Sequence, residues 1–90
     1  MKATVDISLY PLSDAYKDLI VSFVLSLRER EGIDVQTDRM STQIIGDYDV
    51  VMLVLQEEMK AVLEKTRAVF IIKLARGERS GPPPSLKDRE

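Results

Sequence analysis

The feature that most constrains the fold is an N-terminal stretch, residues 3–10, in which apolar and polar side chains alternate. One face carries Ala3, Val5, Ile7 and Leu9, and the other carries Thr4, Asp6, Ser8 and Tyr10. A period of two is typical of a β-strand with one face on a core and the other face open. Pro11 has no N–H to donate and is expected to end the strand. The stretch therefore predicts a sheet whose polar face is available for binding.

Composition limits the function. The chain has 90 residues, enough for one small domain, and a net charge of −2, which gives no basic footprint for nucleic acid. It contains no cysteine and no histidine, which removes disulfides, thiolate metal sites and the commonest general base. No nucleophile–base constellation is evident, so we expect no enzyme. Without a signal peptide or a long apolar run, a cytoplasmic protein with no membrane partner is expected.

Two segments have the pattern of helices. Residues 16–27 form one apolar stripe, made of Tyr16, Leu19, Ile20, Phe23, Val24 and Leu27. Ser13 or Asp14 is expected to cap this helix, and Gly32 to take a left-handed conformation after it.

Residues 48–65 predict a second helix, capped by Asp47. Its apolar face would hold Val51, Met52, Leu55, Met59, Val62 and Leu63, and its solvent face Glu57, Glu58, Lys60 and Glu64. Residues 50–55 alone would also fit a buried strand.

The remaining segments predict strands and a tail. Residues 33–37 and 40–45 are expected to form a hairpin around a turn at Asp38-Arg39, with Gly46 ending the second strand. Residues 68–75 predict a last strand with Phe70, Ile72 and Leu74 on one face and Val69, Ile71 and Lys73 on the other. Residues 1–76 would form one domain, and residues 77–90 a disordered tail rich in proline and charge.

The predicted order of elements is strand, helix, strand, strand, helix, strand. A chain this short cannot build a separate core for each helix, so both helices should cover one face of a four-stranded antiparallel sheet. This is the α+β, ferredoxin-like βαββαβ sandwich, with the first and third strands in the centre. The other sheet face would be partly apolar, which predicts a homo-oligomer, a dimer or tetramer formed through the sheet faces.

With these elements placed, the chain resembles the small, single-domain YkoF-like thiamine-binding family. The resemblance rests on residues 6–12, Tyr16, Met40-Ser41-Thr42 leading to Gly46-Asp47, and residues 71–73, and it spans residues 2–76. It implies a ferredoxin-like fold, assembly through the sheets, no catalytic activity, and binding of thiamine or its hydroxymethylpyrimidine part between sheets. No cofactor and no metal are implied beyond that ligand.

The residue types agree with such a ligand. Thiamine is a cation with an aminopyrimidine, to which Asp6 offers a carboxylate. Tyr10 offers a ring face for cations or stacking. Small donors and acceptors come from Ser8, Ser41, Thr42 and Gln43, which complete the predicted binding site.

Each residue also has a plainer interpretation. Asp6 would equally pair with Lys73 on a neighbouring strand, and Tyr10 would serve as an interface ring. The alternative function is a regulatory or structural homo-oligomer that binds another small metabolite or none.

Overall fold

A computed structural model describes residues 1–38 and 41–78 of the chain. The helices and strands follow one another in the predicted order, and the predicted fold class, an α+β ferredoxin-like sandwich, is confirmed. They are β1 (Lys2–Pro11), α1 (Tyr16–Arg28), β2 (Ile33–Thr37), β3 (Thr42–Asp47), α2 (Tyr48–Lys65) and β4 (Ala68–Arg76).

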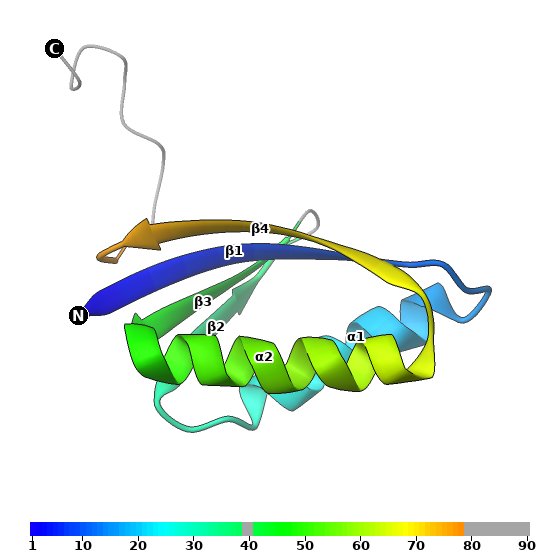
Figure 1. The fold of residues 1–90 in the computed structure, drawn as a ribbon, viewed down its shortest axis with the longest axis horizontal. Helices are drawn as coiled ribbons and strands as arrows, with labels where there is room; N and C mark the ends of the chain where they lie inside the picture. The colour runs from blue at the N-terminus through cyan, green and yellow to red at the C-terminus, as the bar shows by residue number, and fades with distance from the viewer. Residues whose placement is uncertain (39–40, 79–90) are drawn as a thin grey trace, which may run out of the picture.

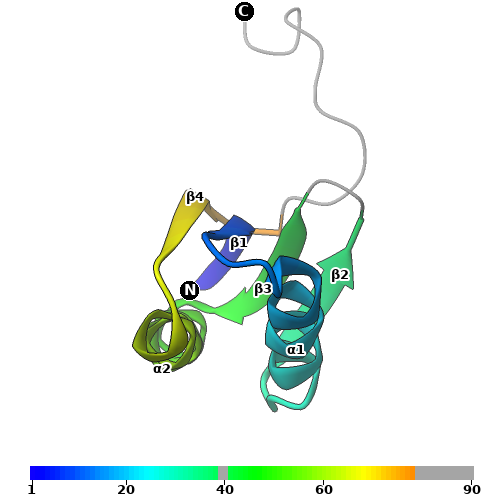
Figure 2. The ribbon, with the colours of Figure 1, turned by 90° about the vertical axis from the view of Figure 1, so that its right-hand side faces the viewer.

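The strands form one antiparallel sheet in the order β2-β3-β1-β4, with β1 and β3 in the centre as predicted. Both helices lie on the same face of this sheet (Figure 1). Viewed along the sheet, α1 lies beneath β2 and β3, and α2 lies beneath β1 and β4 (Figure 2). The opposite sheet face has no helix over it among the described residues.

The core lies between this sheet and the two helices, and β1 supplies its centre. Val5, Ile7 and Leu9 are buried, whereas the outward Tyr10 is half exposed, as the alternation predicts. Helices and β3 complete the cluster with Phe23, Leu27, Ile44, Val51, Val54, Leu55 and Val62. No helix that the structure describes is long and apolar enough to cross a membrane.

The helix prediction for residues 48–65 is confirmed, but its two faces are only partly right. Met52 and Leu63, expected on the buried face, are 39% and 51% exposed. Glu58, expected in water, is buried, because α1 places the Ser26 hydroxyl and the Arg30 guanidinium against its carboxylate. Charge alone does not reveal a buried acid whose partners come from another helix.

The predicted helix caps are wrong in detail. Ala15 is the N-cap of α1, and the Ser13 hydroxyl instead accepts a 3.1 Å hydrogen bond from the Ala15 N–H just outside the helix. Asp47 is the N-cap of α2 but makes no side-chain cap bond; its Oδ1 lies 3.2 Å from the Met1 amino group. Gly32 has φ +84°, the expected left-handed conformation, although α1 already ends at Arg28.

The second strand of the hairpin lies later in the chain than predicted. β3 begins at Thr42 and continues through Gly46 to Asp47, so Gly46 does not end it. The predicted turn residue Arg39 and strand residue Met40 lie outside the described residues. A Cβ on Gly46 would come within 2.8 Å of the Gly32 carbonyl oxygen, so glycine is needed here for close backbone approach.

Gly46→Ala is therefore expected to destabilise the protein. The contact is with backbone rather than with a flexible side chain, and overpacking of this kind costs about 1–3 kcal/mol. Chemical denaturation of the full chain measures the change. An unfolding midpoint equal to that of the parent protein would show that the hairpin relaxes freely.

The described C-terminal end folds back onto the sheet. β4 runs one residue further than predicted, to Arg76, and Gly77 follows it with φ +89°. The Thr4 hydroxyl donates a 2.7 Å hydrogen bond to the Gly77 carbonyl, from the sheet face opposite the helices. Residues 79–90, most of the predicted tail, lie outside the described residues.

Candidate functional site

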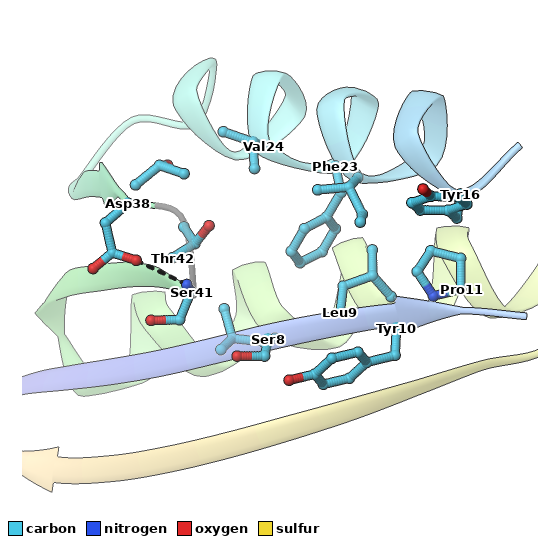
Figure 3. A pocket seen from close by; sticks show the side chains of 13 residues that line it. Ser8, Leu9, Tyr10, Pro11, Tyr16, Phe23, Val24, Asp38, Ser41 and Thr42 are labelled. Atoms are coloured by element: carbon cyan, nitrogen blue, oxygen red, sulfur yellow. Dashed lines mark hydrogen bonds between the residues drawn. The ribbon is translucent and has the colours of Figure 1, made fainter.

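A pocket of about 330 Å³ lies at the end of β1 (Figure 3). Among the described residues, the pairing of β1 with β3 ends at Ile7↔Thr42, whereas its pairing with β4 continues to Pro11↔Ala68. The last residues of β1 therefore extend past β3, and α1 packs above them. The lining comes from β1, α1 and the β2–β3 turn: residues 7–11, Tyr16, Ile20, Phe23, Val24, Thr37, Asp38, Ser41 and Thr42.

The pocket has an apolar interior. Leu9 and Pro11 point from β1 toward Phe23 and Tyr16 on α1 (Figure 3). Phe23 in turn packs on Phe70 of β4, with ring centroids 5.7 Å apart and the planes tilted by 51°. A tilted pair of this kind is a favoured aromatic contact and holds the Phe23 ring in place.

Polar groups gather where the pocket meets the β2–β3 turn. Asp38 Oδ1 accepts a 2.9 Å hydrogen bond from the Ser41 N–H, and the Asp38 N–H donates to the Ser41 carbonyl at 3.1 Å. These two bonds hold Asp38 and the Ser41 backbone together at the pocket. Thr42 follows, buried beside Ile7. The site thus combines a carboxylate, small hydroxyls and an apolar interior, the mixture typical of small-molecule sites.

Two tyrosines flank this pocket. Tyr16 on α1 is 47% exposed and lies near Pro11, and Tyr10 on β1 is 50% exposed and lies on the other side of the strand from Leu9 (Figure 3). Partly exposed phenol rings can stack on a heteroaromatic ligand or contact a cation.

The predicted site residues do not all meet here. Ser8, Tyr10, Ser41 and Thr42 line the pocket. Asp6 and Gln43 do not; they lie opposite each other on β1 and β3. Position along β1 explains the division: Asp6 and Gln43 form a pair within the β1–β3 ladder, whereas Ser8 and Tyr10 lie beyond its last pair, Ile7↔Thr42, where β1 extends past β3.

Asp6 also lies opposite Lys73 in the β1–β4 ladder, as the plainer interpretation requires. Among the described residues, however, no ion pair within 4.0 Å joins them. Asp6 is therefore neither a lining residue of this pocket nor the partner of Lys73.

Sequence reasoning missed Asp38, Tyr16 and Phe23 as lining residues. The sequence presents Asp38 only as part of a turn and Phe23 only as part of a helical stripe, while Tyr16 enters as part of that stripe and of the family resemblance, without a binding role. The available signal was an aspartate at the start of a turn next to hydroxyl residues. Metal binding has no comparable support, since no group of three or more acidic side chains in the described part of the chain is placed to hold an ion.

Comparison with known proteins gives a family match. The model of the YKOF-related Family matches residues 2–74. No curated protein matches the chain.

Solved structures give matches to the fold. A protein from Streptococcus pneumoniae superposes with a TM-score of 0.79 at 21% identity, covering 87% of this chain and 89% of its own. A Thermotoga maritima protein provisionally assigned to thiamine biosynthesis or salvage gives 0.74 at 14% identity, covering 99% and 95%. A hypothetical protein from Methanocaldococcus jannascii gives 0.71 at 21% identity, covering 98% and 91%.

Proposed function

The chain belongs to the YKOF-related Family, and from this premise we propose that it binds a small cationic heteroaromatic metabolite of the thiamine type without transforming it. The observation that supports this most is the pocket at the end of β1, where a carboxylate and hydroxyls adjoin an apolar interior and two tyrosines flank it. The name of the Thermotoga maritima relative points to the same chemistry. The protein would act in the cytoplasm as a binding protein.

The carboxylate that meets the cation is then Asp38 rather than Asp6. Asp38 lines the pocket, and its turn bond to the Ser41 N–H holds it there. A charge-assisted contact to the ligand is roughly twice as strong as a neutral one. The hydroxyls of Ser8, Ser41 and Thr42 would serve the aminopyrimidine, and Tyr10 and Tyr16 would stack on it or contact the cation.

We also propose that copies associate through the sheet face opposite the helices. Tyr10, Val69 and Ile71 on that face are each about half exposed, and apolar groups at such exposure favour a partner surface. In a homo-oligomer of this kind, Asp6 and Gln43 would lie between the two sheets, the place where the sequence predicts the ligand.

Calorimetric titration with thiamine and with hydroxymethylpyrimidine tests the site. Asp38→Asn keeps the side-chain acceptor of the turn but removes the charge. We expect it to weaken thiamine binding about tenfold or more, roughly 1.4 kcal/mol. The neutral pyrimidine should lose less, because it carries no permanent charge.

Asp6→Asn is the matched control, since it removes the same charge outside the pocket. It should leave thiamine binding unchanged. If Asp6→Asn weakens binding and Asp38→Asn does not, the ligand lies on the open sheet face. If neither compound gives heat with the parent protein, the structural-oligomer alternative replaces this proposal.

A further inference from the structure

Two threonines on the central strands are equally buried but differ in their hydrogen bonds. Thr4 on β1 and Thr42 on β3 are each 5% exposed. The Thr4 hydroxyl donates its 2.7 Å hydrogen bond to the Gly77 carbonyl. Among residues 1–38 and 41–78, by contrast, the Thr42 hydroxyl has no hydrogen-bond partner. Since buried polar groups are normally hydrogen-bonded, Thr42 is an exception that needs a reason.

The Thr42 hydroxyl opens into the pocket at the end of β1. Thr42 lines this pocket, and its ladder partner Ile7 belongs to the core, so its side chain lies on the helix side of the sheet (Figure 3). No side-chain oxygen of the described residues is both sealed from solvent and without a partner. A hydroxyl without a partner in so buried a residue therefore borders the open space of the pocket.

Strand pairing fixes the position of this hydroxyl. Thr42 lies opposite Ile7 of β1 and opposite Thr37 of β2, so its backbone is held from both sides. A β-branched side chain has few accessible rotamers at χ1. The hydroxyl is thus in place before a ligand arrives, as a precise binding site requires.

The two polar ends of the site have different surroundings. The lining near the core is apolar, with Ile7, Leu9 and Phe23 all buried. Asp38 is exposed and lies where the pocket meets the β2–β3 turn. A hydroxyl both donates and accepts hydrogen bonds, which suits the edge of an aminopyrimidine, where an amino group donates and a ring nitrogen accepts. A carboxylate suits a cation.

We propose that the Thr42 hydroxyl binds the hydrogen-bonding edge of the heteroaromatic ring and thereby determines which end of the ligand enters the pocket. This inference rests on the proposed function and goes beyond it by fixing the orientation: the pyrimidine lies inside against Thr42, and the cationic end faces Asp38 at the exposed turn. A ring of the same shape without a donor and an acceptor is rejected, because it leaves the buried hydroxyl unpaired.

The matched variants Thr42→Val and Thr4→Val test the proposal, since valine keeps the β-branched shape and removes only the hydroxyl. In calorimetric titration, Thr42→Val should weaken binding of both thiamine and hydroxymethylpyrimidine about fivefold or more. Its urea midpoint should not fall, because no hydrogen bond within the protein is lost. Thr4→Val should do the opposite: its midpoint should fall, and both dissociation constants should stay unchanged.

Two further variants test the role of the hydroxyl and the orientation. Thr42→Ser keeps the hydroxyl and should retain most of the affinity for both compounds. Thr42→Val should affect thiamine and hydroxymethylpyrimidine equally, because both contain the pyrimidine, whereas Asp38→Asn should affect thiamine more.

The outcomes separate this inference from the proposed function. Binding as tight in Thr42→Val as in the parent would overturn the inference and leave the proposed function standing. A midpoint lowered as much by Thr42→Val as by Thr4→Val would also overturn it, since the hydroxyl would then have a structural partner. If the parent protein binds neither compound, the proposed function fails and this inference fails with it.

Discussion

Replacing Leu27 with alanine is expected to lower the free energy of unfolding by about 3–4 kcal/mol. Leu27 is 0% exposed on α1 and belongs to the core cluster between both helices and the sheet. Truncation removes buried methyl groups and leaves a cavity that packed neighbours fill only in part. Urea denaturation followed by circular dichroism measures the loss.

Leu25→Ala is the matched control, because Leu25 lies on the same helix at 53% exposure. Its effect should stay within about 0.5 kcal/mol. Similar losses for both leucines would mean that α1 does not pack on the sheet through its Phe23–Leu27 face.

Replacing Glu58 with alanine is expected to cost about 2–3 kcal/mol, because a buried charged acceptor and its hydroxyl donor are separated. Ser26 Oγ donates to both carboxylate oxygens of Glu58, at 2.9 Å from Oε2. The Glu58 side chain is only 7% exposed. After the substitution the Ser26 hydroxyl would remain between the helices without this acceptor. Thermal and urea denaturation measure the change.

Arg30 stabilises the buried Glu58 carboxylate less than Ser26 does. Its Nε lies 3.5 Å from Glu58 Oε1, but its side chain is one-third exposed, so water screens the pair. Its Nη1 lies 2.9 Å from Glu57, and this hydrogen bond is the main cause that raises the pKa of the Arg30 guanidinium, which therefore stays cationic.

Glu57→Ala is the control for Glu58→Ala. The Glu57 side chain is 51% exposed, and its ion pair with Arg30 lies in water, so the change should be much smaller than for Glu58. Equal losses at the two positions would contradict the assignment of the stabilisation to the Ser26–Glu58 hydrogen bonds.

Local pattern was sufficient for most of the fold. The alternation of β1 and the stripe of α1 predicted most of their buried side chains, because these periods follow from backbone geometry; the exceptions are Thr4, which is buried, and Tyr16, which is exposed. Chain length then forced both helices onto one sheet face. The boundaries of β3 were not predictable in this way: Gly46 looked like a strand end, and its need for close approach to Gly32 arises only once the two segments are adjacent.

The candidate site was predictable only in part. Ser8, Tyr10, Ser41 and Thr42 were identified from residue type and family resemblance, and all four line the pocket. Asp6 was predicted because its place in a regular strand shows which way it faces, whereas Asp38 was predicted only as part of a turn, and a turn residue has no periodicity that shows where it points. The β1–β3 ladder determines which aspartate lines the pocket. Its last pair, Ile7↔Thr42, brings Asp38 to the end of β1.

The sequence by itself determined the order of elements, the buried face of β1, the class of fold and the family. The tertiary structure alone decided that Glu58 is buried, that Asp38 rather than Asp6 lines the pocket, and that the Thr42 hydroxyl opens into that pocket. The reason is physical. Periodicity reports how a residue is oriented within its own element, whereas burial of a charge, a pocket or an edge depends on which other element lies opposite, and that depends on register and packing between segments distant in the chain.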